Sequence, residues 1–150
     1  MKCLVTGGAG FIGSHLVNRL VLDEHEVIII DDLSTGKEEN INPKAKFYRK
    51  DITQMRRDSD FTMFEGVDVV FHLAAFPRVQ PSIEEPMLAH NINVDGTLSV
   101  LNTCRLSGVK RVVLTSSSAV YGEAETPTTE EHTTNPMSPY ALHKLIAEQY

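Results

Sequence analysis

The feature that most constrains the fold is a glycine-rich stretch at residues 6–13, with the sequence TGGAGFIG. It follows Lys2–Thr6, whose mixture of apolar and β-branched residues is typical of a buried strand. It opens Phe11–Leu22, in which apolar residues recur at the spacing of one helix face. A strand that runs through a glycine turn directly into a helix predicts the first half of a βαβ unit.

Three glycines of this stretch, at positions 7, 10 and 13, each have a physical role in such a turn. Gly7 lets the chain turn tightly out of the strand, Gly10 lets backbone N–H groups approach a pyrophosphate, and Gly13 lets the helix pack closely on the sheet. A pyrophosphate would then lie at the positive end of the helix dipole. The same spacing also occurs in tight turns without a ligand, so a dinucleotide site requires an acidic partner further along the chain.

Asp31 supplies this partner, since it lies eighteen positions after Gly13 at the end of a second apolar run. Its carboxylate can accept hydrogen bonds from both hydroxyls of an adenosine ribose and would repel a 2′-phosphate. No arginine follows it directly, and Lys37 is the nearest cation in the sequence. NAD is therefore predicted in preference to NADP. For the neighbouring Asp32, capping of the following turn remains an open alternative.

Strand-like and helical patterns alternate along the rest of the chain. The expected strands are Lys2–Thr6, Glu26–Asp31, Ala45–Arg49, Val67–Leu73 and Arg111–Ser117. The expected helices are Phe11–Leu22, a long one that Pro86 opens and that ends at Gly108, and one that begins near Ser138. This alternation predicts an α/β fold in which a doubly wound, mostly parallel (Rossmann) sheet carries helices on both faces. We expect residues 1–150 to form a single NAD-binding domain of this kind.

Further cofactor contacts are expected where the later strands end, because ligands of doubly wound sheets bind beyond the carboxyl ends of the strands. The residues expected there are Asp51, Ile52, Leu73, Ala74 and Ala75. We expect His72, which precedes the last three, to be a hydrogen-bonded, partly buried imidazole rather than a ligand. Asn91, Asn93 and Gly96 are poor helix formers inside an expected helix. Asn93 is accordingly predicted to anchor backbone near the active site.

Tyr140 and Lys144 stand four positions apart at the start of the last expected helix, so their side chains project from one face. Ser117 ends the fifth expected strand, which brings it to the edge of the sheet where ligands bind. Residues 118–139 between these motifs have no period and are expected to form a long functional loop. A serine, a Tyr/Lys pair and a dinucleotide turn are therefore expected to converge on one crevice.

Several motifs together, in order and spacing, resemble those of the extended short-chain dehydrogenase/reductases of the NAD-dependent epimerase/dehydratase type. The motifs are TGGAGFIG, the turn at residues 31–36, DI, HLAA, NVDGT, SSSAVYG and SPYALHK, and they span essentially the whole chain. The most similar branch is the UDP-glucose 4-epimerase-like group. The resemblance implies that Ser117 is the catalytic serine, Tyr140 the acid/base and Lys144 its partner.

The resemblance also implies a cofactor, a substrate and a reaction. The residues expected to contact NAD are Gly7, Gly10, Phe11, Ile12, Gly13, Asp31, Asp32, Leu33, Thr35, Gly36, Asp51, Ile52, Leu73, Ala74, Ala75, Asn93, Tyr140 and Lys144. The expected reaction is epimerisation of a nucleotide-linked sugar, in which a hydride passes to NAD, a keto sugar turns over, and the hydride returns to its other face. A phenol is a weak base at neutral pH, and the positive charges of the lysine and of the nicotinamide would favour its ionised form.

Other reactions stay open at this point. Dehydratases and decarboxylases of the family place carboxylates just after the catalytic serine or threonine, where this chain has Ser118 and Ala119. Epimerisation or simple redox chemistry is therefore favoured. The alternatives are another nucleotide-sugar redox enzyme (a dehydratase, decarboxylase or reductase) and a non-catalytic NAD-binding fragment. Arg78 and Ser82 fall where members of the family begin to touch substrate.

The chain stops at Tyr150, inside the helix expected to carry Tyr140 and Lys144, so we expect it to be incomplete. The resemblance implies that a C-terminal substrate domain is missing, and the 150-residue piece alone is expected to be inactive. It also implies a homodimer that forms through the two long helices, residues 87–108 and the one that begins near residue 138.

Composition excludes several other classes. The formal net charge is -6 and no basic run is longer than Arg56-Arg57, so no nucleic-acid partner is expected. The apolar runs are too short to span a bilayer and the first residues lack a signal-peptide pattern, so we expect a cytoplasmic protein without a membrane partner. No pair of histidines has the spacing of a metal site. Cys3 and Cys104 lie in apolar stretches and are expected to be reduced core residues.

Overall fold

A computed structural model describes residues 1–55 and 58–150, and the basic pair Arg56 and Arg57 lies outside the described residues. Five strands form one sheet in the order β3-β2-β1-β4-β5. They are β1 (Lys2–Thr6), β2 (Glu26–Asp31), β3 (Lys46–Arg49), β4 (Val69–His72) and β5 (Arg111–Leu114). All four neighbouring pairs are parallel. The strand order reverses between β1 and β4, as in doubly wound folds, so the expected fold class is confirmed.

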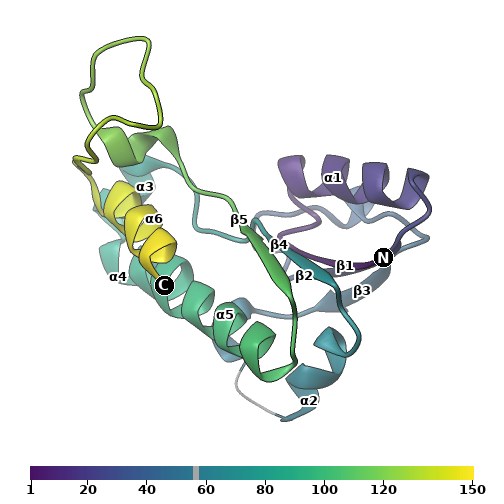
Figure 1. Cartoon of the computed structure of the whole chain (residues 1–150). Helices are drawn as coiled ribbons and strands as arrows, with labels where there is room; N and C mark the ends of the chain where they lie inside the picture. Colours follow the sequence, from purple (N-terminus) through teal and green to yellow (C-terminus); the bar gives the residue numbers. More distant parts are fainter. Residues whose placement is uncertain (56–57) are drawn as a thin grey trace.

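Helices cover both faces of the sheet (Figure 1). α1 (Phe11–Leu22) packs against β1 and β2 on one face, and α5 (Thr97–Leu106) packs against β4 on the other. α6 (Pro139–Gln149) packs against α3 (Val79–Glu84), α4 (Pro86–His90) and the π-helical turn η4 (Asn91–Gly96). Shorter helical pieces are α2 (Asp58–Phe61) and the turns η1 (Glu38–Asn40), η2 (Ile52–Gln54), η3 (Thr62–Phe64) and η5 (Ser118–Tyr121). Across residues 1–55 and 58–150, no helix is both long and apolar enough to cross a membrane.

Alternation along the strands divides the buried apolar side chains into two cores. On β1, Cys3 and Val5 belong to the core that includes Val17 of α1, whereas Leu4 belongs to the core that includes Val100 of α5. The side chains of β2 alternate between the two cores in the same way. Successive residues of a strand point to opposite faces, so a strand covered on both faces has to be apolar almost throughout. The continuous apolar runs in the sequence have this origin.

β4 and β5 are shorter than the sequence predicts, and the last inter-strand bonds beyond them come from the N–H groups of Leu73 (to Thr6, 3.2 Å) and Thr115 (to His72, 3.3 Å). β4 ends at His72 and β5 at Leu114. Beyond β5, the Thr115 carbonyl accepts a hydrogen bond from the Lys144 ammonium (2.8 Å) instead of extending the ladder. β3 also begins one residue later, and β4 two residues later, than expected.

The single long helix expected between Pro86 and Gly108 is interrupted in its middle. The backbone keeps helical dihedral angles through η4, but its hydrogen bonds follow the wider π pattern there. Gly96 ends η4, and a Cβ on it would lie only 2.8 Å from the Cδ1 atom of Ile52. α3 was not predicted, because it is short and contains Pro81, although a proline is tolerated in the first turn of a helix.

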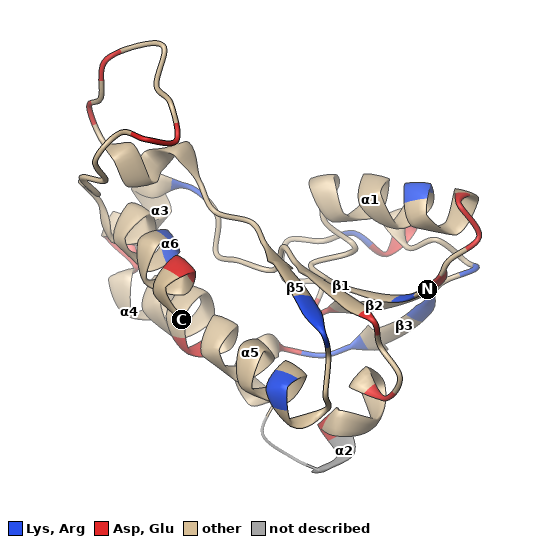
Figure 2. Ribbon diagram, in the orientation of Figure 1, with Lys and Arg blue, Asp and Glu red and all other residues tan. Residues whose placement is uncertain are grey.

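The long segment between β5 and α6 is irregular, as expected. After η5 it contains no helix or strand before Pro139. It projects beyond α3 and α6 (Figure 2), and its acidic residues are Glu123, Glu125, Glu130 and Glu131. The Asn135 N–H donates to the Val120 carbonyl (2.8 Å) and closes the base of this projection. The projection therefore begins and ends close to the residues that carry the chemical motifs.

Candidate active site

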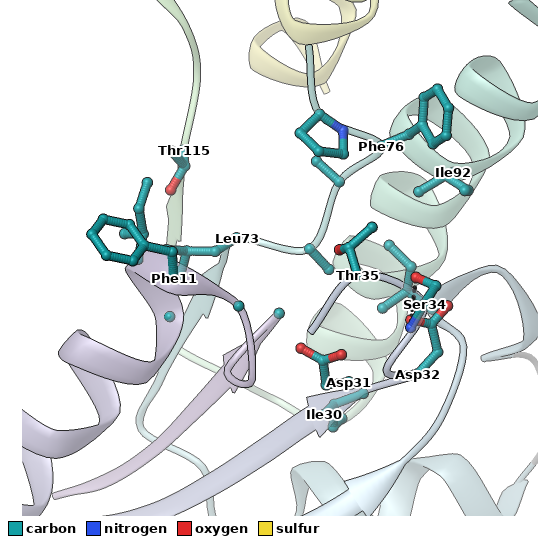
Figure 3. Close-up of a pocket in the computed structure, with 18 of the residues that line it drawn as sticks. Phe11, Ile30, Asp31, Asp32, Ser34, Thr35, Leu73, Phe76, Ile92 and Thr115 are labelled. Atoms are coloured by element: carbon teal, nitrogen blue, oxygen red, sulfur yellow. Dashed lines mark hydrogen bonds between the residues drawn. The ribbon is translucent and has the colours of Figure 1, made fainter. Parts of the chain in front are cut away.

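A crevice of about 450 Å³ opens where the strands of the sheet end. Its lining comes from the glycine turn after β1, the turn after β2, the segments after β4 and β5, and α6. Figure 3 shows Phe11 at the start of α1, Asp31 at the end of β2 and Thr115 after β5 around this space. The crevice includes the point between β1 and β4 where the strand order reverses, which is the ligand-binding position of doubly wound sheets.

Most residues predicted to contact a cofactor line this crevice. They are Gly7, Gly10, Phe11, Ile12, Gly13, Asp31, Asp32, Thr35, Asp51, Ile52, Leu73, Ala74, Ala75, Tyr140 and Lys144. Within the described residues, the predicted positions that do not line it are Leu33, Gly36, Asn93 and Ser117. The lining also includes four polar residues that the sequence analysis did not select: Ser34, Lys50, Thr115 and Ser116. All four lie in segments that follow the carboxyl end of a strand, and this position is the signal that could have identified them.

The backbone around the glycine turn leaves no room for side chains at Gly7 and Gly13. Gly7 has a φ of +71°, and a Cβ on it would lie 2.7 Å from the Ala74 nitrogen. A Cβ on Gly13 would lie 2.1 Å from the Gly7 carbonyl oxygen, so Gly13 packs the helix on the turn rather than on the sheet as predicted. α1 begins after Gly10 with no side-chain cap and no acidic residue in its first turn. The positive end of the helix is therefore free to hold an anion.

Asp31 is 7% exposed and joins the glycine turn to the turn after β2. Its Oδ2 accepts from the Ala9 N–H (2.9 Å) and its Oδ1 from the Leu33 N–H (2.9 Å). A carboxylate can accept about four hydrogen bonds, so acceptor positions remain for two ribose hydroxyls on the side that faces the crevice (Figure 3). Asp32 caps the following turn instead, because its Oδ1 accepts from the N–H (2.8 Å) and the hydroxyl (2.6 Å) of Ser34.

His72 is a hydrogen-bonded imidazole, as predicted, although it is fully rather than partly buried. Its Nδ1 lies 2.7 Å from the Thr6 hydroxyl oxygen and its Nε2 lies 3.0 Å from that of Thr97. The Thr97 hydroxyl donates to the Asn93 carbonyl (2.7 Å), so it accepts from Nε2–H. The Thr6 hydroxyl accepts from the Ala74 N–H (3.2 Å), so its own proton is available to donate to Nδ1. The contacts thus assign the neutral imidazole with its proton on Nε2.

Burial lowers the pKa of His72 to about 3, and the positive charge of Lys144 adds to the lowering. In the unfolded chain the imidazole has an ordinary pKa of about 6.5. Between these two values the unfolded state binds a proton that the folded state does not, so stability falls as the pH falls. We expect the free energy of unfolding to decrease by up to about 1.4 kcal/mol for each pH unit below pH 6.5 through this group.

Denaturant titrations of the 150-residue chain at neutral and mildly acidic pH test this expectation. His72→Gln should be less stable at neutral pH but should lose stability less steeply on acidification than the wild type. His15→Gln, which changes an exposed histidine of α1, is the matched control and should keep the wild-type slope. Equal slopes in the three proteins would show that His72 is not responsible for acid sensitivity.

Asn93 is buried and bonds to the backbone of Phe76 through both ends of its amide. Its Oδ1 accepts from the Phe76 N–H (2.7 Å), and its Nδ2 donates to the Phe76 carbonyl (3.1 Å). The backbone anchoring predicted for Asn93 is therefore present. Because Phe76 lines the crevice, Asn93 holds one wall of it from behind.

The position of Tyr140 is fixed by the first turn of α6. Ser138 caps this helix by accepting a hydrogen bond from the Ala141 N–H (3.1 Å). The Tyr140 N–H donates to the hydroxyl of Ser82 on α3 (3.0 Å). Ser82 is fully buried, and this hydrogen bond joins α3 to α6. Arg78, just before α3, lines the crevice and has a φ of +78°.

Lys144 lies one helical turn after Tyr140 on the same side of α6, and both line the crevice. Its ammonium donates to the Thr115 carbonyl (2.8 Å) and lies 5.9 Å from the centre of the Tyr140 ring. Burial lowers the pKa of Lys144 below its ordinary value. The end of β5 therefore holds a largely buried cation beside the phenol ring.

Ser117 immediately precedes η5, and its Oγ accepts from the Ala119 N–H (3.2 Å). Its neighbour Ser116 lines the crevice, and the Ser116 hydroxyl donates to Glu148 of α6. Among the described hydrogen bonds, none joins Ser117 to Tyr140 or Lys144. The catalytic role of Ser117 stays a prediction.

Cys3 and Cys104 are free thiols, one in each core, as the sequence predicts. Burial raises the pKa of Cys104 to about 12, so this thiol stays protonated at neutral pH. Within the described ranges, no group of three or more His, Cys, Asp or Glu side chains is arranged to hold a metal ion.

The strand order, the glycine turn and Asp31 define the class of dinucleotide-binding α/β domains. Comparison with known families narrows this class. The sequence profile of the NAD dependent epimerase/dehydratase family matches residues 3–150, and the chain belongs to that family.

Individual relatives agree with this assignment. A putative UDP-glucose 4-epimerase of Methanocaldococcus jannaschii is 46% identical over 149 residues, which are 98% of this chain and 48% of the relative. The UDP-glucose 4-epimerase of Lactobacillus helveticus is 40% identical over 150 residues, which are 99% of this chain and 46% of the relative. The chain therefore spans about half the length of the curated relatives it matches.

Solved structures give the same result for the fold. The crystal structure of a Thermotoga maritima UDP-glucose 4-epimerase with UDP-glucose has a TM-score of 0.94 and 39% identity, and the match covers 100% of this chain and 50% of that one. The Thermus thermophilus UDP-glucose 4-epimerase in complex with NAD has a TM-score of 0.92 and 37% identity, with 100% and 49% of the two chains covered. The parallel five-stranded fold is thus shared with NAD-dependent epimerases.

Proposed function

We propose that this chain is the cofactor-binding part of an NAD-dependent epimerase that acts on a nucleotide-linked sugar of the UDP-glucose/UDP-galactose type. The observation that supports this most strongly is that Tyr140 and Lys144 line the same crevice as the glycine turn and Asp31. Hydride transfer from an alcohol requires a base, since the hydroxyl proton has to leave as the hydride does, and a phenol beside a lysine at a dinucleotide site can serve as one.

NAD is proposed to lie across the point where the strand order reverses. Its pyrophosphate would rest at the N-terminus of α1 and its adenosine ribose at Asp31. The small residues Ala74 and Ala75 leave room for the remainder beside Tyr140. When bound there, NAD supplies the acceptor that takes a hydride from the sugar carbon and gives it back.

Tyr140 is proposed to remove the proton of the sugar hydroxyl and to return it later. Lys144, fixed by the Thr115 carbonyl, provides a positive charge that stabilises the phenolate form of such a base. Ser117 is proposed to hydrogen-bond the sugar hydroxyl and to share its proton with Tyr140. The keto sugar formed in this way would turn over in the site, so that the hydride returns to the other face of its carbonyl carbon, and Tyr140 would give the proton back to the carbonyl oxygen, which completes the epimerisation.

The residues after Ser117 favour this reaction over elimination. Ser118 and Ala119 occupy the positions at which loss of water or carbon dioxide would need an additional acid and base. The alternatives within the family remain a dehydratase, a decarboxylase or a reductase that acts on a nucleotide-sugar. A protein that only binds NAD is the alternative from a different functional class.

The proposal is tested by incubating NAD and UDP-glucose with the full chain, meaning the longer protein of which residues 1–150 are proposed to be the cofactor-binding part. Conversion to UDP-galactose, an isomer of identical mass, is expected. A product of lower mass would indicate elimination, net reduction of NAD would indicate a simple dehydrogenase, and NAD binding without any turnover would indicate a binding module.

A homodimer is also proposed, on the resemblance to the family and on the helices that the fold leaves at the surface. Large apolar residues are exposed on the three neighbouring helices α4, α5 and α6, namely Met87, Leu88, Leu98 and Leu142. Large exposed apolar residues that gather on neighbouring helices are typical of protein interfaces.

Asp31 is expected to set the preference for NAD. Asp31→Asn combined with Asp32→Arg should lower the preference for NAD over NADP by about tenfold or more, because a negative charge beside the 2′-position is exchanged for a positive one. Asparagine is chosen because it keeps the size of the side chain and one of the two oxygen acceptors that bond the N–H groups of Ala9 and Leu33. Dissociation constants for the two cofactors measure the effect.

The matched control is Asp32→Asn alone, which changes the neighbouring carboxylate that caps the turn. It should leave the preference between the cofactors close to that of the wild type. An unchanged preference in the double variant would show that Asp31 does not bind the adenosine ribose.

A further inference from the structure

Ala9, the residue before the N-cap of α1, has both its N–H and its carbonyl hydrogen-bonded to residues that end or follow β2. Its N–H donates to the Asp31 carboxylate (2.9 Å). Its carbonyl accepts two hydrogen bonds, from the Lys37 N–H (3.1 Å) and from the side-chain amide of Asn40 (2.9 Å). Ala9 itself is completely buried. Both peptide groups of this residue are therefore fixed by residues 31–40.

The orientation of these peptide groups matters for the glycine turn. The carbonyl of Ala9 and the N–H of Gly10 belong to one rigid peptide plane, so holding the carbonyl also sets the direction of that N–H. The Gly10 N–H donates to the Gly7 carbonyl (3.1 Å), which closes the turn. Gly10 is also the residue from which α1 starts. The hydrogen bonds to Ala9 thus fix the turn at the position where an anion would bind.

Asn40 is the side-chain donor to the Ala9 carbonyl. It lies in η1, where Glu38 and Glu39 are exposed and Asn40 alone is half-buried. The remaining contacts of the segment with Ala9 come from a backbone N–H, from the Asp31 carboxylate and from close packing, since a Cβ on Gly36 would lie 2.9 Å from the Ala9 Cβ. Removal of one amide therefore loosens the turn without removing the segment.

We propose that Asn40 is a positioning residue for the pyrophosphate of a dinucleotide. It acts through the Ala9 carbonyl and holds the glycine turn in its phosphate-binding conformation, without touching the cofactor. This inference rests on the proposed NAD site. A ligand that requires one conformation of a turn binds more weakly in proportion to the loss of that conformation. A ligand that contacts only the adenosine end is not affected in the same way.

Calorimetric titration of the cofactor-free full chain with NAD, ADP and adenosine tests the inference. In Asn40→Ala, the dissociation constants for NAD and ADP should rise about 5- to 10-fold, as expected for loss of one hydrogen bond, while that for adenosine changes less than about twofold. Asn40→Asp keeps the size of the side chain but has no donor for the Ala9 carbonyl, and it should weaken NAD and ADP at least as much.

The matched control is Asn42→Ala. Asn42 lies in the same segment, but its amide donates to Asn18 and makes no bond to the glycine turn. All three affinities should be unchanged in this variant.

The outcomes separate the inference from the proposed function. If the wild type binds neither NAD nor ADP, the proposed cofactor site is wrong. If the wild type binds both and the Asn40 variants match it, or if adenosine weakens as much as ADP, the positioning role is wrong while the cofactor site stands. Thermal unfolding of each variant shows whether it is folded. If Asn40→Ala does not fold, the affinities of Asn40→Asp test the positioning role.

Discussion

Replacement of Tyr140 by phenylalanine in the full chain is expected to lower kcat for epimerisation by a factor of about 10²–10⁴, the contribution usual for a positioned general acid or base. NAD affinity should remain within about twofold of the wild type, because the change removes a single hydroxyl and leaves most cofactor contacts in place. The ring should keep its position, because the backbone N–H of residue 140 still donates to the Ser82 hydroxyl and Lys144 is still held by the Thr115 carbonyl.

Tyr150→Phe provides the matched control for this prediction. Tyr150 follows α6, is 59% exposed and is not part of the crevice lining. The Tyr150→Phe variant should retain wild-type kcat and KM. Near-normal turnover by Tyr140→Phe would mean that a different group moves the proton, and equal loss in both variants would mean that the effect comes from α6 as a whole.

Replacement of Gly7 by alanine is expected to have the second large effect. Gly7 and Gly108 have nearly the same left-handed φ, +71° and +72°. A Cβ on Gly108 would meet nothing within 4 Å, whereas a Cβ on Gly7 would lie 2.7 Å from the Ala74 nitrogen. Gly108→Ala should therefore lower the free energy of unfolding by about 1–2 kcal/mol through backbone strain alone, and Gly7→Ala by about 1–3 kcal/mol more through the clash.

Denaturant unfolding of the two variants measures the difference, and titration with NAD measures its consequence. The clash moves the turn or the segment after β4, both of which line the crevice, so NAD affinity should fall about tenfold or more in Gly7→Ala, equivalent to about 1.4 kcal/mol. Gly108→Ala should bind NAD normally. Equal destabilisation of the two variants would show that the close contact with Ala74 is relieved without cost.

The local patterns of the sequence predicted the first three elements to the residue. β1, α1 and β2 have the bounds expected, because glycines follow the first strand and a continuous apolar run supplies both faces of each strand. The later strands were predicted too long, because Val67 and Leu73 beside β4 and Thr115 after β5 are as apolar or β-branched as the strands themselves. Composition alone does not distinguish a residue that extends a ladder from one that lines a crevice.

The candidate site was predicted as a set of convergent motifs, and the structure brings Asp31, the glycine turn, Tyr140 and Lys144 to one crevice. The supporting contacts were not predictable in the same way. The bonds of His72 to Thr6 and Thr97 join residues 66 and 25 positions apart. The bond from Asn40 to Ala9 spans 31 positions. Such contacts follow from the packing of the whole sheet, and no local spacing encodes them.

The central claim is that a phenol and a lysine act on a sugar beside a cofactor seated on the glycine turn. A nucleotide-sugar labelled with deuterium on the carbon that changes configuration tests this most directly. The full chain with NAD is expected to invert that carbon and to retain the deuterium on it, because hydride transfer away and back involves no exchange with water. Turnover in which the deuterium is lost to solvent would mean that the carbon is deprotonated instead, and this result would contradict the account.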